Sequence, residues 1–497
     1  MKNKITQKLI YRPEANQLTF APKIICDKAI ITYLLALIAC SVLYSAHMLS
    51  FQWWIFGIIC VLGFFYFANR QTKLWHNFRS AAFTKQLFWS AFALRVVWVF
   101  VSFYLYHQWT DSAFSIDAAD ELFYDEMGHY GASLMRNGTF AIYNPLIEYA
   151  GTVAFSDMGY PIYLSILYYI FFDSILIARI IKALLSAWTV VLVYKLATRN
   201  FGESIGRMAA IFCMMMPNLI YYCSFQLKEV EMVFLTMLFV ERADWLLRQP
   251  KLKAMQTIAV MLVPLTLFMI RTALAATLVA AFFCALLLTT GRVSGFGKRA
   301  VLIAVAGIFA VTMMVTSTSI GTEVKQMWET RGSKQKATNE WRATRIDEGG
   351  FNNRLIKYAG ASVFAPMIFT LPFPTMAETH GQENQKMIHG GNFVKNILSY
   401  FTIMALVVLL FSGAWRKHVL PLAVLCGYLV VLVFSNFAHS ERFHQPILPL
   451  TLMFAALGLS LIKENSWINR YYNYWCVLMF LAAIAWNWFK LAGRGMI

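Results

Sequence analysis

The sequence is poor in charge, and above all in acidic residues. Only 14% of the 497 residues are charged, with 25 Asp and Glu against 43 Lys and Arg, whereas about 25% of the residues of a soluble protein are charged. Hydrophobic residues make up 59% of the chain, and the mean hydropathy is +0.56. This composition excludes a disordered chain, a coiled coil and a conventional soluble enzyme.

Motifs that mark soluble enzymes and metal sites are also missing. The sequence has no Walker loop, no HExxH and no GxSxG motif, and it shows no internal repeat. The eight cysteines show no CxxC spacing, and all but Cys26 lie in apolar blocks. They are therefore expected to be small core residues, not a disulfide framework or a metal site.

What the chain does contain is a series of long apolar blocks. The first begins at Ile30 and is long enough to cross a bilayer core of about 30 Å. We predict an all-α polytopic membrane protein with its N-terminus inside and about 13 transmembrane helices. The predicted crossings lie at 29–48, 51–68, 86–107, 175–195, 208–225, 230–247, 254–270, 272–290, 300–320, 393–413, 419–437, 446–462 and 472–489.

The basic residues follow this topology. The segments predicted to lie inside contain 24 Lys and Arg but 6 Asp and Glu, which accounts for the whole net charge of +18. Cytoplasmic loops of membrane proteins are rich in Lys and Arg, so the charge does not indicate nucleic-acid binding. The inside segments are 1–28, 69–85, 195–207, 241–253, 292–299, 414–418 and 463–470.

Two apolar stretches do not fit as crossings. Met158–Phe172 and Ala361–Pro374 are short and contain Pro, so we expect helices or re-entrant segments at the outer interface. Two long outer loops result, 109–174 and 321–392. Long outer loops favour chemistry at the membrane surface over transport, which usually uses short loops and a site in the middle of the membrane.

Acidic residues gather in the first of these loops. Eight of the 25 acids lie between Asp111 and Asp157, five of them in the run "DAADELFYDE". In a helix, Asp117, Asp120 and Glu121 would share one face with Asp125. Clustered carboxylates can act as a base or bind a divalent cation. A solvated acidic loop is the alternative interpretation.

The order of several motifs along the chain points to a family. Arg95 in "FALRVVWVF" is followed by the acidic run, "GHYGASLMRNGTF", "GYPIYLSILYYIFF", "MMMPNLIYYCSFQLKE" and "SERFHQPILPLTLMFAALGL". This order resembles the membrane glycosyltransferases of the GT-C superfamily. The nearest branch holds the dolichyl-phosphate-mannose protein mannosyltransferases and the bacterial aminoarabinose transferase of lipid A. The resemblance covers 86–270 and 435–460, whereas 292–434 matches by topology only.

The resemblance implies a division of the chain and a set of catalytic residues. Residues 1–85 would form a basic segment and a two-helix hairpin, 86–290 a GT-C-like catalytic membrane core, and 291–497 a C-terminal membrane region. The carboxylates that match the family's acidic positions are Asp120 and Glu121, with Asp125 as a second register, and Glu229 after the fifth predicted crossing.

The resemblance also implies cationic residues that bind the phosphate of the donor. The candidates are Lys228, Arg271 and Arg442, of which Arg442 matches the family's Arg-aromatic-x-x-Pro motif. A guanidinium binds phosphate through two parallel hydrogen bonds. An Arg in the middle of a bilayer costs about 2.5–3.5 kcal/mol, so Arg271 would face a polar cavity or end a helix at the interface. Lys228 and Glu229 have the alternative of a helix-end charge pair.

Other polar residues have more than one interpretation. Arg95 and Arg179 are structural or line a polar cleft. His439 and His444 flank Arg442 in the sequence. They are interpreted as metal ligands, as acids or only as polar loop residues. The loop 321–357 contains eight basic residues and is expected to cover the site, to bind an anion or to be solvated.

As a member of this family the chain would be an inverting glycosyltransferase. The expected donor is a polyprenyl-phosphate-linked sugar, and the acceptor an envelope lipid, glycan or protein. No cofactor is established from the sequence, a divalent cation is left open, and nucleic acid is not expected. The chain would lie in a bacterial inner membrane with its site facing the periplasm. The alternatives are a polysaccharide polymerase of the O-antigen type and a lipid-linked glycan transporter or flippase.

Overall fold

In the computed structural model, helices are the regular elements of the described residues. The one β-type contact among these residues is an isolated antiparallel bridge between Met48 and Ala377. The all-α prediction is therefore confirmed for this part of the chain. The structure describes residues 18–151, 158–249, 254–288, 367–379, 381–434, 440–492 and 495–497.

Seven of the described helical segments are long and apolar enough to cross a membrane. Each coincides with a predicted crossing, and the chain is a helical integral membrane protein. The segments are α2 (Lys23–Leu43), α3 (Phe51–Leu74), α4 (Ser80–Thr110), α8 (Ile175–Phe201), α18 (His389–Phe411), α22 (Ser466–Ala492), and the run of α20 (Glu441–His444), η5 (Gln445–Ile447) and α21 (Leu448–Ser460).

An eighth predicted crossing is broken near its middle. It consists of α9 (Glu203–Met215), followed by α10 (Pro217–Tyr221) and η3 (Tyr222–Ser224), and the two parts differ in direction by 54°. The break coincides with Pro217. Proline has no N–H to donate and its ring clashes with the carbonyl four residues earlier, so a helix kinks or ends there.

Four more predicted crossings are helices but are too short or too polar to count as membrane spans. α12 (Ala254–Ile270) and α13 (Thr272–Leu288) have 17 residues each, and α19 (Val419–Phe434) has 16. A helix of 17 residues rises about 26 Å, short of the bilayer core. α11 (Glu229–Arg248) has 20 residues but is too polar. The predicted crossing 300–320 lies outside the described residues, so the total of about 13 stays a prediction.

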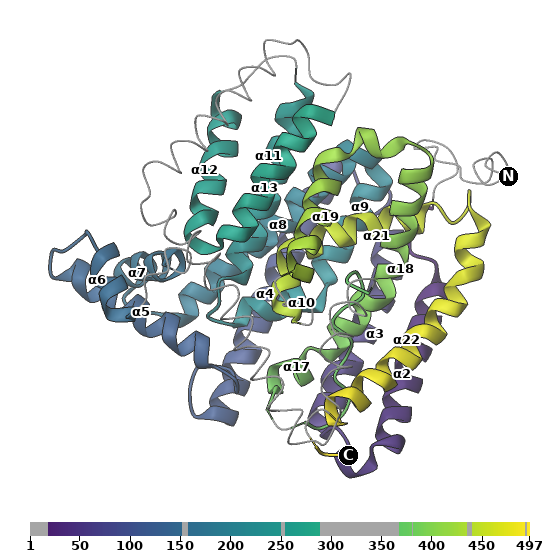
Figure 1. Ribbon diagram of the computed structural model, residues 1–497, viewed down its shortest axis with the longest axis horizontal. Helices are drawn as coiled ribbons and strands as arrows, with labels where there is room; N and C mark the ends of the chain where they lie inside the picture. The colour runs from purple at the N-terminus through teal and green to yellow at the C-terminus, as the bar shows by residue number, and fades with distance from the viewer. Residues whose placement is uncertain are drawn as a thin grey trace.

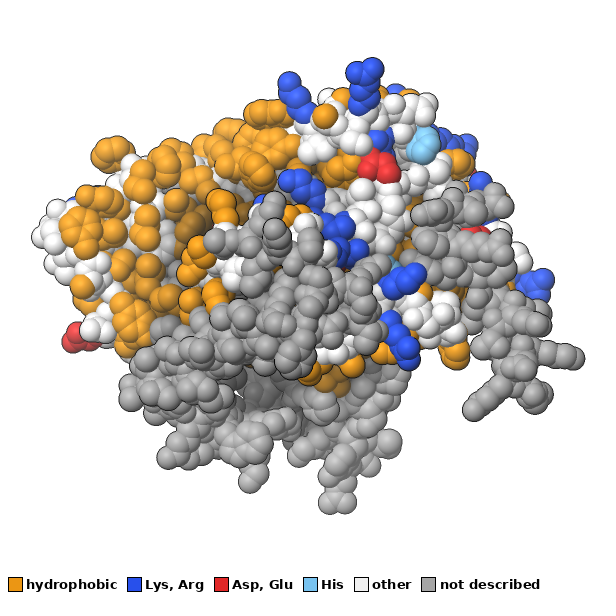
Figure 2. Space-filling model, turned by 90° about the horizontal axis from the view of Figure 1, so that it is seen from above, with side chains coloured by type: hydrophobic (Ala, Val, Ile, Leu, Met, Phe, Trp, Pro, Cys, Tyr) orange, Lys and Arg blue, Asp and Glu red, His pale blue; other side chains and the backbone are white. Residues whose placement is uncertain are grey.

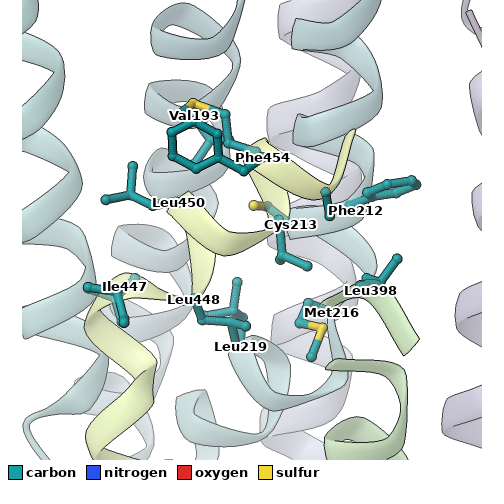
Figure 3. Close-up of a cluster of buried hydrophobic side chains, with 14 of the residues drawn as sticks. Val193, Phe212, Cys213, Met216, Leu219, Leu398, Ile447, Leu448, Leu450 and Phe454 are labelled. Carbon is teal, nitrogen blue, oxygen red and sulfur yellow. The ribbon is translucent and has the colours of Figure 1, made fainter. Parts of the chain in front are cut away.

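The two ends of the chain pack together. α2 lies beside α22, and α3 contacts α18 and α9 (Figure 1). The side chains of Val193, Phe212, Leu398 and Phe454 belong to a cluster between α8, α9, α18 and α21 (Figure 3). Gly458 allows α21 to approach α18 closely, because a Cβ there would lie 1.9 Å from the carbonyl oxygen of Phe401.

The loop 109–174 carries three helices. They are α5 (Ala119–Arg136), α6 (Tyr143–Ala150) and α7 (Gly159–Phe171), which lie together at one side of the molecule (Figure 1). α7 matches the helix expected over Met158–Phe172. The second short apolar stretch differs, because its described part from residue 367 to residue 374 is a turn followed by irregular chain without helix. Two prolines and a cis Leu371–Pro372 bond fall in this part.

The two ends of the helix bundle differ in charge. Arg199 of α8 pairs with Glu241 and Asp244 of α11, and Arg248 donates to Asn200, so the C-terminal ends of α8 and α11 meet. Seen from above the view of Figure 1, Lys and Arg side chains gather on the exposed surface and few acids accompany them (Figure 2). The N-terminal ends of α8 and α11 lie at the opposite end, next to α5 and α7.

Candidate functional site

Arg442 joins two carboxylates that are far apart in the sequence. Its Nη1 pairs with the carboxylate of Asp120, and its Nε pairs with that of Glu229. Asp120 lies in the first turn of α5, Glu229 is the first residue of α11, and Arg442 belongs to α20. The structure therefore brings together three of the residues that the sequence singled out. We call Asp120, Glu229 and Arg442 the triad.

The three members of the triad differ in exposure. The side chain of Asp120 is 61% exposed, that of Arg442 21%, and that of Glu229 2%. A buried ion pair loses hydration, and removing one partner leaves the other charge buried without compensation. Glu229 also lines a small cavity inside the helix bundle. The other residues of this cavity are Ser186, Thr189, Leu219, Tyr222, Val230, Val233 and Gln445.

Glu121 is buried beneath Asp120 and fixes the start of α5. Its carboxylate accepts hydrogen bonds from the hydroxyl of Ser115 and from the backbone N–H of Gln226 at 2.7 Å. Its Oε2 lies 3.7 Å from Nη2 of Arg179. Burial raises the pKa of Glu121 above its ordinary value, against the opposing effects of Arg179, Ser115 and Gln226. Its contacts make Glu121 a link between α5, α8 and the segment before α11.

The two other predicted phosphate ligands lie beside the triad. Lys228 immediately precedes Glu229, and its Nζ donates to the carbonyl of Ile270 at 3.1 Å and lies 5.7 Å from the ring centre of Tyr124. Arg271 occupies the break between α12 and α13, with its guanidinium 4.5 Å from the ring centre of Phe443. Arg271 is therefore at a helix end next to α20 and not inside a continuous span.

Asp125 belongs to a separate cluster. It accepts a hydrogen bond from the hydroxyl of Tyr168, and its Oδ2 lies 3.2 Å from Nε2 of His129. The expectation that Asp120 and Asp125 share one face of the helix is wrong, because a spacing of five residues turns the two side chains about 140° apart around α5. The structure therefore separates the two acidic registers that the sequence left open, and only the first reaches Arg442.

The segment between η3 and α11 carries contacts that the sequence did not predict. Gln226 donates through its backbone to Glu121 and through its side chain to the hydroxyl of Tyr168 at 2.9 Å. Lys182 of α8 donates to the carbonyl of Leu227 and pairs with Glu231 at 3.1 Å. Glu231 thus pairs with a cation of α8, whereas Glu229 pairs with Arg442. The only signal in the sequence was the polar run that interrupts two apolar blocks.

Two of the buried basic residues differ in role. Arg95 is 0% exposed and donates to Ser186 and to backbone carbonyls at the break after α9, so it is structural. Arg179 is also 0% exposed and lies beside Glu121, 6.0 Å from the ring centre of Tyr106. His444 is buried, and His439 and the loop 321–357 lie outside the described residues.

A divalent cation does not fit the triad as it stands. Asp120 and Glu229 both pair with Arg442, and a cation that used these carboxylates would have to displace the guanidinium. Among the residues that the structure describes, no group of three or more His, Cys, Asp and Glu side chains is arranged to hold a metal ion.

Comparisons with known proteins assign the chain to no family. No protein-family model matches the chain, and no curated protein matches it. A function for this chain rests on the residues of the site and on their arrangement.

Proposed function

We propose that the chain is a GT-C-like glycosyltransferase. It moves a sugar from a polyprenyl-phosphate-linked donor to an envelope lipid, glycan or protein on the outer face of the membrane. The membrane is a bacterial inner membrane, and the site faces the periplasm. The observation that carries the proposal is the Arg442 bridge between Asp120 and Glu229. It joins the two acidic positions and the basic position that the family resemblance implies, at the end of the helices opposite the basic loops.

Asp120 is the residue that we assign as general base. Its side chain is 61% exposed, so an acceptor hydroxyl can reach it, whereas Glu121 is buried and engaged by Ser115 and Gln226. A general base takes the acceptor's proton as the acceptor attacks, so it must be a carboxylate that the acceptor hydroxyl can contact. Positioned general bases contribute about 100-fold to 10,000-fold to a rate.

The cationic side chains near the triad suit a phosphate leaving group. Lys228, Arg271 and Arg442 lie on three segments around Glu229. Charge grows on the phosphate in the transition state, and preorganised cations stabilise it there. Glu229 holds Arg442 in place from the buried side, so the guanidinium can exchange Asp120 for phosphate without losing its anchor.

The reaction is a single displacement at the anomeric carbon. The acceptor oxygen forms a bond to this carbon while Asp120 takes the hydroxyl proton. The bond between the anomeric carbon and the phosphate oxygen breaks, and the electron pair leaves with the polyprenyl phosphate. Attack from the face opposite to the leaving group inverts the configuration of the sugar.

The test is the release of polyprenyl phosphate by the purified protein. The donors are a panel of polyprenyl-phosphate sugars, and the acceptor is a cell-envelope lipid extract. Asp120→Asn is expected to lose activity by about 100-fold or more. Asp111→Asn is the matched control, because Asp111 is an exposed residue of the same loop with a φ of 52°, and asparagine tolerates this left-handed conformation.

Two results would overturn the proposal. Turnover only with a diphosphate-linked oligosaccharide would identify a polymerase of the O-antigen type. Absence of turnover with every donor, from a protein that stays monodisperse, would favour the transport of a lipid-linked glycan. Equal loss of activity in Asp111→Asn and Asp120→Asn would remove Asp120 from the role of base.

A further inference from the structure

Outside the triad, the ring of His129 lies between two carboxylates. Its Nε2 is 3.2 Å from Oδ2 of Asp125, and its Nδ1 is 3.1 Å from Oδ1 of Asp173. Asp125 lies one turn earlier in α5, and Asp173 lies in the turn that joins α7 to α8. The ring also stacks on Tyr168 of α7, with 4.5 Å between ring centres. One side chain of α5 thus contacts both α7 and the turn that follows it.

A protonated ring is the form that suits both carboxylates, and its contact with Oδ1 of Asp173 is an ion pair without a hydrogen bond. Neutral imidazole has one N–H and one lone pair, so one of the two aspartates would face a lone pair. The hydrogen bond from His129 to Asp125 raises the pKa of His129 above 6.5, although burial acts in the opposite direction. The side chain is 39% exposed, so the proton exchanges with solvent.

The turn that His129 contacts has an unfavourable backbone conformation. Phe172 and Asp173 have φ values of 52° and 61°, in the left-handed region that bulky residues rarely adopt. Arg136 of α5 supports the same turn, because its Nη1 lies 2.7 Å from Oδ2 of Asp173 and its Nη2 donates to the carbonyl of Tyr168 at 2.9 Å. Side chains of α5 therefore hold the turn in place.

A chain of hydrogen bonds connects His129 to the start of α5. Asp125 accepts from the hydroxyl of Tyr168, which in turn accepts from the side chain of Gln226 at 2.9 Å. The backbone N–H of Gln226 donates to Glu121 at 2.7 Å, and Glu121 is the neighbour of Asp120. The contacts of His129 thus continue to the residue next to the triad.

We propose that His129 is a positioning residue whose protonated ring ties α5 to the α7–α8 turn and so holds the Asp120 end of α5 in place. Deprotonation releases one of its two carboxylates. We call the paired contacts of His129 with Asp125 and Asp173 the tie. The tie is a property of the fold, and only its effect on turnover rests on the proposed function.

The direction of the pH dependence follows from the groups around the ring. These are Asp125 and Arg136 on α5, Tyr168 on α7, Asp173 in the turn, and Arg179 on α8, which acts on Tyr168. A histidine whose pKa is raised in the folded state adds stability below the ordinary value of 6.5, and this stability disappears as the pH rises through the folded value. His129 therefore contacts both carboxylates at low pH and loses one of these contacts at high pH.

The first measurement is an NMR titration of histidine side chains in the protein in lipid nanodiscs. His129→Gln identifies the signal of His129 by its disappearance. We expect a pKa above 6.5 in the wild type, and a lower value in Asp173→Asn, which removes one of the two carboxylates. A wild-type pKa of 6.5 or less would overturn the proposal without any appeal to a variant.

The second measurement is hydrogen exchange over α5 and the α7–α8 turn at several pH values. Wild-type protection factors are expected to fall about tenfold for each unit by which the pKa of His129 exceeds 6.5, and His129→Gln is expected to lose this pH dependence. His107→Gln is the control, because His107 is exposed on α4 and packs on Phe103. The same pH dependence in His129→Gln and in the wild type would contradict the tie.

Turnover separates this proposal from the proposed function. If the protein is active, the pH profile of kcat is expected to lose its decline at high pH in His129→Gln and to keep it in His107→Gln. Identical profiles in an active protein would remove the positioning role. A protein without transferase activity whose exchange still depends on His129 would retain the tie and lose only the proposed function.

Discussion

A guanidinium nitrogen of Arg95 donates to the carbonyl oxygen of Cys213 at 3.2 Å. This oxygen would accept from the N–H of residue 217 in an unbroken helix, but residue 217 is proline. A second nitrogen donates to the carbonyl of Met214 at 3.2 Å. Arg95 therefore satisfies the carbonyls that the break between α9 and α10 leaves open, and the break leads the chain toward Glu229.

Arg95→Gln is accordingly expected to destabilise the protein strongly. A buried carbonyl without a donor costs about 1–3 kcal/mol, and Arg95 serves at least two of them. We expect a loss of about 2 kcal/mol or more, seen as a lower melting temperature in tryptophan fluorescence. Arg70→Gln is the control, since Arg70 is an exposed residue of α3 that contacts Tyr66. Equal shifts in both variants would contradict this role of Arg95.

The buried half of the triad can be tested by a double-mutant cycle. Arg442→Gln leaves the charge of Glu229 buried without its partner, and a broken buried pair costs about 3–5 kcal/mol. Glu229→Gln removes that charge, so the double variant is expected to be more stable than the sum of the single losses by about 0.5–3 kcal/mol. The free energy of unfolding of the wild type, the two single variants and the double variant is measured in mixed micelles. Additive losses would show that the two side chains do not interact.

The helices of this fold were accessible from the sequence because apolar length is a local property. Twelve predicted crossings coincide with helices or with the broken run of α9 and α10. The number of spans was less accessible. Helices such as α12 and α19 are shorter than the bilayer core is thick, and whether they cross depends on their packing and surroundings.

The charged residues of the site were easier to find than its neutral ones. Asp120, Glu229 and Arg442 stand out because charges are rare in this chain. The choice between Asp120 and Asp125 required the orientation of α5, which a loop sequence does not determine. Gln226 and Ser115 could not be recognised, because an uncharged polar residue becomes informative only when its partner Glu121 is known.

Glu121 gives a prediction for the pH dependence of stability. Burial raises the pKa of Glu121 above 4.5, so its stabilising contribution is complete below 4.5 and declines as the pH rises through the folded value. Glu121→Gln keeps an acceptor for Ser115 and Gln226 but does not titrate. The melting temperature of the variant, relative to the wild type, is therefore expected to increase with pH above 4.5. A difference that stays constant with pH would show that the pKa of Glu121 is unchanged by folding.

The contact between α18 and α21 gives a prediction that involves no charge. A Cβ at Gly458 would lie 1.9 Å from the carbonyl oxygen and 2.7 Å from the carbonyl carbon of Phe401. Both atoms belong to the backbone of α18, so Gly458→Ala must push the two helices apart. Overpacking of a core costs about 1–3 kcal/mol, and we expect a lower melting temperature.

Gly63 provides the matched control for this substitution. It lies within α3, and a Cβ at this position would meet no atom within 4 Å. Alanine is a better helix former than glycine by about 1 kcal/mol, so Gly63→Ala is expected to leave the melting temperature unchanged or to raise it. If Gly458→Ala behaved in the same way as Gly63→Ala, α18 and α21 would not approach each other as closely as the structure shows. Opposite shifts would locate the close contact at Gly458, because helix propensity alone would raise both.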